Sequence, residues 1–203
     1  RIAAPGVGRT LWEGRVERMA FDGVGCGPLL WQLRPLALLS GRLEFQCFVQ
    51  SGRGGGELRF GRSIFGATFA REVRLTLPAA DLGRQLRLPL VRLEGDFQID
   101  LDELRAAAGG VESVRGRVAW QGARVLQPDP LPLGTLTLQL DTRDGRIGGV
   151  LGDEGGPLEL SGELSVETDR SYRLDALLKA RADAPPQLRQ ALGLLGAPDA
   201  QGR

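Results

Sequence analysis

A glycine begins an alternating apolar and polar run at five places in this chain of 203 residues. The five positions are Gly14, Gly41, Gly95, Gly116 and Gly162. Successive side chains of a β-strand point to opposite faces, so a period of two gives a strand one apolar and one polar face. Repetition of this signal along the chain predicts an antiparallel sheet with its core on one side. Strands used in this way are expected to provide a scaffold and a surface rather than a reaction centre.

The number and spacing of these runs define the expected fold class. The chain is expected to be all-β, with about ten strands in a single antiparallel sheet that is strongly curved, in a half-pipe or sandwich-like form. The pattern has no break, so residues 1–203 are expected to form a single domain. Asp144-Gly145 is a hairpin turn dipeptide. A short C-terminal helix is predicted over residues 185–196, because prolines begin it and Leu188 and Leu192 share a helical face.

Several individual segments carry weaker local signals. Residues 10–21 are expected to form the first strand, and the glycine-rich residues 51–56 a flexible hairpin loop. A short helix is expected over residues 79–86, directly after a proline. Residues 88–101 are expected to form a strand, and residues 102–108 a helical turn that follows it.

The alternation within each run also identifies the side chains expected on the apolar face. They are large aliphatic or aromatic residues at every second position. This face, core or groove, is predicted to contain Trp31, Leu33, Leu43, Phe45, Val49, Phe97, Ile99, Val118, Trp120, Leu136, Leu138, Leu160 and Leu164.

The composition excludes several kinds of catalytic and metal site. Histidine is absent from the sequence, so a Ser-His-Asp or Cys-His site and a histidine-containing zinc site are excluded. Paired carboxylates remain, at Asp100, Asp102 and Glu103 and at Asp153 and Glu154. They lie at strand ends and turns, where acidic residues are usually solvated. No enzymatic activity, no cofactor and no metal site are therefore expected.

The charge balance limits the classes of partner. There are 26 basic and 25 acidic residues, and the basic residues form no cluster, so nucleic-acid binding is not expected. No stretch approaches the roughly 20 apolar residues that span a bilayer. The chain starts at Arg1 without a secretory signal, and we expect any membrane anchor to lie upstream of it.

The order of short sequence blocks is more specific than any single strand pattern. A W-x-L-R-P-x-x-L-L-x-G block and an L-R-Q-A-L-x-L-L-G-x-P-D tail stand out. The ordered blocks are Thr10–Gly14, Trp31–Leu43, Leu88–Gly95, Gly116–Trp120, Leu131–Leu136, Gly155–Leu164 and Leu188–Arg203. In this order they resemble the type II secretion system protein N family of Gram-negative bacteria, over nearly the whole chain.

The resemblance implies an accessory component of the machine that exports folded proteins across the outer membrane. Members of that family look like single-pass inner-membrane proteins with one periplasmic domain. The implied location is the periplasmic face of the inner membrane, and the implied partners are the secretin and the inner-membrane platform. Free edge strands make strand addition a natural docking mode, and Arg15, Glu57 and Arg173 are expected at candidate edges.

A different class of function stays open beside this one. An antiparallel sheet with one apolar face can curl into a trough, as in the envelope proteins of the AsmA and lipopolysaccharide-transport kind, and bind or transfer lipid. The two hypotheses differ in whether Trp31, Phe45, Phe97 and Trp120 pack against other protein or line an open trough. A carbohydrate-binding sandwich would expose aromatic platforms, and the single Tyr disfavours it.

The two cysteines, Cys26 and Cys47, are candidates for one disulfide bond. The oxidising periplasm that the resemblance implies and the even cysteine count favour the bond. Strand parity opposes it. Cys47 shares a face with Phe45, whereas Cys26 falls on the face of Leu30 and Gln32, opposite to Trp31, unless a local bulge shifts the alternation. The alternative is two separate small apolar side chains.

Overall fold

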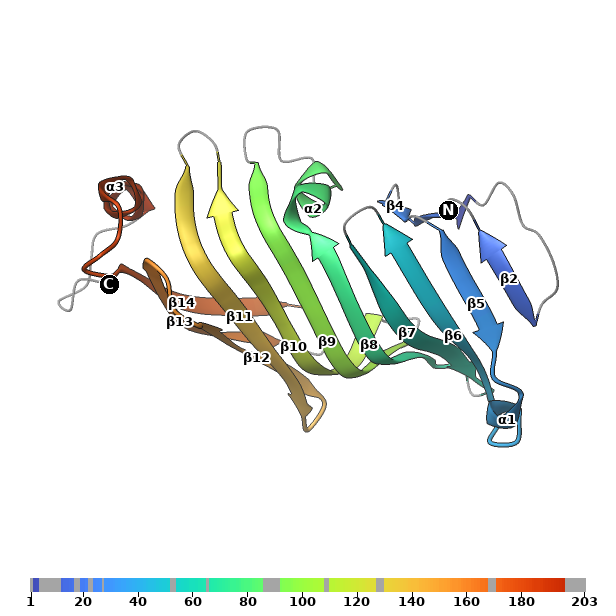
Figure 1. Cartoon of the computed structure of the whole chain (residues 1–203). Coiled ribbons are helices and arrows are strands. Elements are labelled where there is room, and N and C mark those ends of the chain that lie inside the picture. Colours follow the sequence, from blue (N-terminus) through green and yellow to red (C-terminus); the bar gives the residue numbers. More distant parts are fainter. Residues whose placement is uncertain are drawn as a thin grey trace. The chain divides into compact units, whose positions relative to one another are not determined.

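Long antiparallel strands make up most of the chain (Figure 1). The computed structural model describes residues 2–3, 12–16, 19–21, 24–26, 28–51, 54–64, 66–85, 92–107, 110–126, 130–167 and 171–195. Eleven strands form one sheet in the order β14-β13-β12-β11-β10-β9-β8-β7-β6-β5-β2, and β1, β3 and β4 form a second sheet. Neighbours in the large sheet are almost all consecutive in sequence, so it is built mainly by hairpins and is not closed.

The elements have the following bounds. The strands are β1 (Ile2–Ala3), β2 (Glu13–Val16), β3 (Met19–Phe21), β4 (Val24–Cys26), β5 (Leu29–Leu33), β6 (Arg42–Ser51), β7 (Gly54–Ser63), β8 (Thr68–Pro78), β9 (Leu93–Ala107), β10 (Gly110–Val125), β11 (Leu131–Arg143), β12 (Arg146–Asp153), β13 (Leu158–Val166) and β14 (Tyr172–Ala180). The helices are α1 (Pro35–Leu38), α2 (Ala79–Gln85) and α3 (Pro186–Leu195).

The predicted fold class is confirmed: one open antiparallel sheet dominates, and a short helix follows it. The helices expected after Pro78 and near the C-terminus are present as α2 and α3. The Asp144-Gly145 turn is also confirmed, since both residues have positive φ, 51° and 76°, and Arg143 lies opposite Arg146. Such angles match the right-handed twist of a hairpin.

Three local expectations were wrong. The helical turn expected over residues 102–108 is wrong for its described part, because residues 102–107 form the end of β9, where pairing with β8 and β10 outweighs the helix propensity of the alanines. Gly54, expected in a loop, begins β7 and pairs with Ser51. The described part of residues 10–21 contains two strands, β2 and β3, which belong to different sheets.

The chain divides into two compact units. The first contains residues 1–77 and 99–116, and the second residues 78–98 and 117–203. In the first unit, Leu33 lies opposite Phe45, which lies opposite Phe60, so that β5, β6 and β7 share an apolar row. The Trp31 ring covers Gly14 of β2, where a Cβ atom would lie 2.0 Å from the ring. Glycine on β2 therefore makes room for the tryptophan.

The core of the second unit lies between α3 and one face of the sheet. Leu188 of α3 is 2% exposed and packs with Leu158 and Ala184. Partly buried leucines of β11 surround this cluster. On β9 and β10, Phe97 stacks on Trp120 with ring centroids 5.2 Å apart, and the Trp120 indole N–H donates to a backbone carbonyl at 2.9 Å. The helix covers only part of the face, and apolar side chains of β14 beyond it are exposed.

Candidate functional site

The carboxylates that the sequence offered as catalytic candidates are not gathered into one constellation. Glu103 accepts a hydrogen bond from Arg71 at 3.0 Å, and Glu154 forms an ion pair with Arg117. Asp100 and Asp102 are exposed on β9. Within the described residues, no three His, Cys, Asp or Glu side chains are placed to hold a metal ion.

Asp153 is a buried carboxylate with a structural role at the β12–β13 turn. It accepts hydrogen bonds from the Gly155 and Leu160 backbone N–H groups at 3.0 and 2.9 Å, and from Arg181 at 2.7 Å. Burial by itself raises the pKa of Asp153, but these bonds and the positive charge of Arg181 outweigh burial and lower the pKa below its ordinary value. Asp153 is thus held ionised, and joins the turn to the segment after β14.

Asp153→Asn is expected to lower the free energy of unfolding at neutral pH by about 1–2 kcal/mol, because hydrogen bonds to a charged acceptor are lost. The folded-state pKa lies below the unfolded one, so the carboxylate stabilises the fold above the unfolded pKa and ceases to do so as pH falls through the folded pKa. The difference between wild type and variant should therefore shrink below about pH 4. Urea unfolding across this pH range measures it. Glu154→Gln, at an exposed position, is the control, and a difference that persists unchanged at low pH would contradict the assignment.

Exposed aliphatic side chains gather around α1. We define the α1 patch as Leu36, Leu38, Leu39 and Ile64, which are 79%, 47%, 87% and 76% exposed. The Ile64 backbone N–H donates to Gly41 at 3.1 Å, so the β7–β8 turn adjoins the α1 turn. Contiguous exposed apolar surface of this kind usually marks an interaction site.

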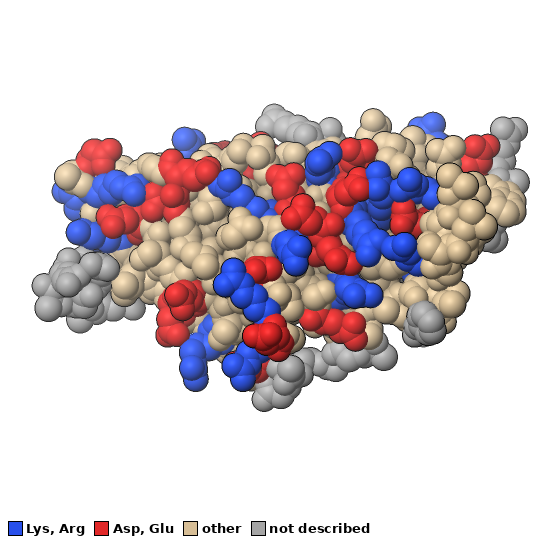
Figure 2. Space-filling view, turned by 90° about the horizontal axis from the view of Figure 1, so that it is seen from below, with Lys and Arg blue, Asp and Glu red and all other residues tan. Residues whose placement is uncertain are grey.

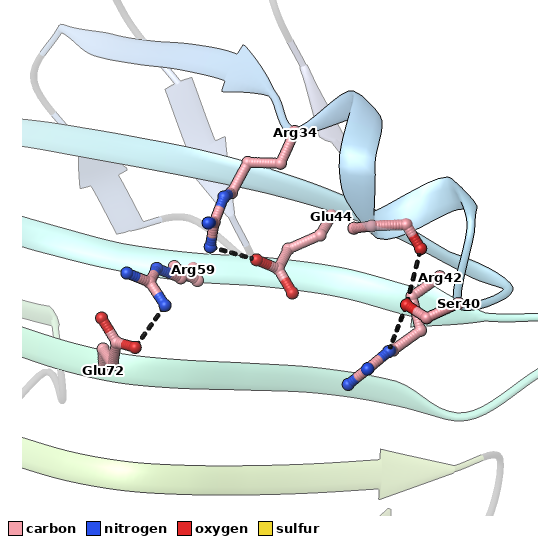
Figure 3. A network of polar contacts seen from close by, with 7 residues as sticks. Arg34, Ser40, Arg42, Glu44, Arg59 and Glu72 are labelled. Atoms are coloured by element: carbon pink, nitrogen blue, oxygen red, sulfur yellow. Dashed lines mark hydrogen bonds and ion pairs between the residues drawn. The ribbon is translucent and has the colours of Figure 1, made fainter.

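A set of polar contacts fixes the backbone beneath the α1 patch (Figure 3). Arg34 donates from its backbone and its side chain to Glu44, both at 2.8 Å, and the Glu44 side chain is buried. The Ser40 hydroxyl donates to the Ala37 carbonyl and accepts from Arg42 at 3.1 Å. The turn is therefore held on both sides, and its leucines are presented to solvent in a defined arrangement.

Charged side chains occupy the strand face that carries Glu44. Glu44 lies opposite Gly61, and further along this face Gln46 lies opposite Arg59, which pairs with Glu72 (Figure 3). Figure 2 shows basic and acidic residues interspersed on the face in view. Because charges of both signs are interspersed among the described residues in view, these residues form no broad basic field, which agrees with the balanced composition.

The residues predicted for the apolar face differ in exposure. Leu33 and Leu160 are buried. Leu43 instead is 39% exposed, because it lies at the start of β6 beside the α1 turn, opposite Arg62 rather than a second apolar side chain. The remaining residues are half-buried: Trp31, Phe45, Val49, Phe97, Ile99, Val118, Trp120, Leu136, Leu138 and Leu164.

Two of the three residues proposed for edges lie on the outer strands of the sheet. Arg15 is on β2 and Arg173 is on β14. Glu57 was misplaced: it lies on β7, which pairs with both β6 and β8. Residues 54–56, expected to lie in a loop, continue the ladder up to Glu57.

Cys47 is a buried thiol without a disulfide bond among the described side chains, and burial raises its pKa above the ordinary thiol value. The Cys26 side chain lies outside the described side chains, so the Cys26–Cys47 bond stays a prediction. Thiol titration of denatured, unreduced protein from the periplasm should find no free thiol. Two free thiols would refute the bond.

The α1 patch was not found as a site from the residues alone. Its signal is the run Leu36-Ala-Leu-Leu39, which follows Pro35 and breaks the alternation between two predicted strands. From sequence alone, such an apolar run can be either buried or exposed. Its exposure becomes known only when the structure shows that the neighbouring strands do not cover it.

These features define a class of protein: an open antiparallel sheet whose prominent surface feature, among the described residues, is an apolar contact patch. The family model for "Type II secretion system (T2SS), protein N" matches residues 2–203, and the chain belongs to this family. It is a component of the type II secretion system.

Three relatives, each called type II secretion system protein N, agree with this. The Aeromonas hydrophila protein is 31% identical over 100% of this chain and 81% of its own length. The Vibrio cholerae serotype O1 protein is 28% identical over 98% of this chain and 80% of its own length. The Pectobacterium carotovorum protein is 30% identical over 95% of this chain and 77% of its own length. No solved structure matches the chain. None of the described helices has the length and apolar character needed to cross a membrane.

Proposed function

We propose that residues 1–203 act as a single, non-enzymatic periplasmic domain at the inner membrane. The domain binds other proteins of the type II secretion machinery, namely the secretin, the inner-membrane platform, or both. Family membership supports a role in the type II secretion machinery. The open sheet with its exposed apolar patch supports protein binding rather than catalysis. No nucleic-acid partner and no cofactor are part of the proposal.

The α1 patch is the observation that carries this proposal. Leu36 and Leu39 are almost fully exposed on a turn that Arg34, Glu44 and Ser40 hold in place. An ordered apolar surface loses little conformational freedom when a partner covers it, so more of the burial free energy is available for binding. Arg34 and Arg42 beside the patch supply a polar rim.

Photocrosslinking in cells tests the proposal. A photoreactive residue at Leu39 is expected to capture the secretin or a platform subunit. The matched control is Leu194 of α3, which is 84% exposed but stands outside the α1 patch, and it should capture neither. Equal capture from both positions, or no secretion protein captured from Leu39, would overturn the proposal.

Lipid binding is the second candidate, and one observation favours it. Trp31, Phe45, Phe97 and Trp120 are all half-buried, so the apolar face retains accessible aromatic surface within each unit. A photoreactive residue at Phe45 or Phe97 that captured phospholipid or lipopolysaccharide, together with normal secretion after deletion of the gene, would replace protein docking with lipid binding as the function.

A further inference from the structure

The outer strand β14 presents an unpaired edge. Within the described residues its strand partner is β13, and no strand pairs with its other side. The Arg181 backbone N–H donates to the Pro157 carbonyl, and the Glu167 backbone N–H donates to the Ser171 carbonyl. These two bonds show which residues of the strand form the hydrogen-bonded pairs with β13. Odd-numbered residues of β14 therefore bond to β13, and the backbone groups of the even-numbered residues from Tyr172 to Ala180 point outward.

The same strand carries charges that lack partners in the described part of the chain. Asp175 lies directly opposite Glu163 on β13, an unfavourable pairing of like charges. Lys179, the one lysine in the sequence, lies opposite Glu159 but forms no ion pair with a described residue. An acidic and a basic side chain thus stand four residues apart on one face of an open edge.

We propose that β14 pairs antiparallel with β14 of a second copy of this chain, in the register that places Leu177 opposite Leu177. Asp175 of each copy then lies opposite Lys179 of the other. The outward backbone groups of Ala176 lie opposite those of Leu178 of the second copy. Those of Leu174 lie opposite those of Ala180 of the second copy. Even-numbered residues face even-numbered residues, so the hydrogen-bonding phase is satisfied throughout the overlap from Leu174 to Ala180.

Charge selects this register from its neighbours. Full overlap of the two strands would centre on Ala176 and place Arg173 opposite Lys179 of the second copy, which is repulsive. A register centred on Asp175 would oppose two carboxylates. A register centred on Leu174 would pair Arg173 with Asp175 but shorten the overlap to Tyr172–Ala176. The Leu177 register combines two pairs of opposite charge with a ladder from Leu174 to Ala180. In this register Arg173 faces Arg181 of the second copy only beyond the end of β14, where the Arg181 guanidinium is bound to Asp153 at 2.7 Å.

The twofold symmetry also extends the apolar surface. An axis perpendicular to the sheet keeps the same face of both copies on the same side. Leu174 and Leu178, which are 52% and 37% exposed, then adjoin Ala180 and Ala176 of the second copy. On the opposite face, a shallow hollow lined by Val150, Glu163 and Leu177 adjoins the position of Lys179 of the second copy. This inference does not rest on the proposed function, because the α1 patch belongs to the other unit.

Charge exchange combined with sedimentation tests the proposal on the 203-residue chain. A concentration-dependent dimer is expected. Asp175→Lys and Lys179→Asp should each weaken it by at least about tenfold, because each replaces two attractive contacts with two repulsive ones. The double variant should restore the dimer, and a mixture of the two single variants should form a mixed dimer. Arg143→Asp, at an exposed hairpin position, should leave the dimer unchanged.

Circular dichroism establishes that each variant is folded. A folded monomer at every concentration would overturn the proposal, and so would a dimer whose affinity the single exchanges leave unaltered. Failure of the double variant and of the mixture to restore the dimer would overturn the register. None of these outcomes depends on whether Leu39 captures a secretion protein.

Discussion

Replacing Gly95 with alanine is expected to lower the free energy of unfolding by about 2–4 kcal/mol. Gly95 has φ +97°, in a region that side chains other than glycine rarely adopt. A Cβ atom there would also lie 2.3 Å from the carbonyl oxygen of Gln121 and 2.7 Å from that of Gly122. Both obstacles are backbone atoms of β10, so the two strands must move apart.

Gly145→Ala separates the two effects. Gly145 has φ +76° in the β11–β12 hairpin, but nothing lies within 4 Å of an added Cβ atom. Alanine there meets backbone strain without a clash and should cost about 1 kcal/mol. Urea unfolding of both variants measures the difference. Equal losses would show that the approach of β9 to β10 at Gly95 is looser than the structure has it.

Leu188→Ala is expected to destabilise the second unit by about 2–5 kcal/mol, the range for deletion of a buried leucine side chain. Leu188 is 2% exposed and attaches α3 to Leu158 and Ala184. Its loss removes apolar contacts and leaves a cavity between helix and sheet. Hydrogen exchange should show faster opening of α3 together with lower global stability.

Leu194→Ala on the same helix is the control. Leu194 is 84% exposed, so its truncation should change the free energy of unfolding by less than about 0.5 kcal/mol. A loss below about 1 kcal/mol for Leu188→Ala would instead mean that α3 is not anchored to the sheet as described.

Periodicity explains which elements were predictable. Long runs such as residues 135–140 alternate strictly between apolar and polar side chains, and they form β11, although its burial does not alternate: these residues are half-buried except for the exposed Gln139. The helix α3 was predictable because its leucines recur at helical spacing between terminating residues. The end of β9 was not, because Leu104 to Ala107 favour helix locally and only pairing with the flanking strands β8 and β10 decides otherwise.

The candidate site was predictable only in part. The block around Trp31 and Leu43 indicated the family, and the absence of histidine excluded most catalytic sites. Exposure of Leu36 and Leu39 depends on the contact between Arg34 and Glu44, which are ten residues apart and separated by a turn. Asp175 and Lys179 lack ion-pair partners in the described part of the chain because β14 lies at the end of the sheet. Strand alternation does not specify that position.

Secretion by cells that carry only the Leu36→Ser/Leu39→Ser variant tests the docking role of the α1 patch most directly. Both side chains are exposed, so the variant should keep the thermal stability of the wild type. We expect export of a folded substrate protein to fall at least about tenfold, as for loss of an interface hot spot, while cells with Leu194→Ser export normally. Full export by a stably expressed double variant would contradict a docking role for this patch.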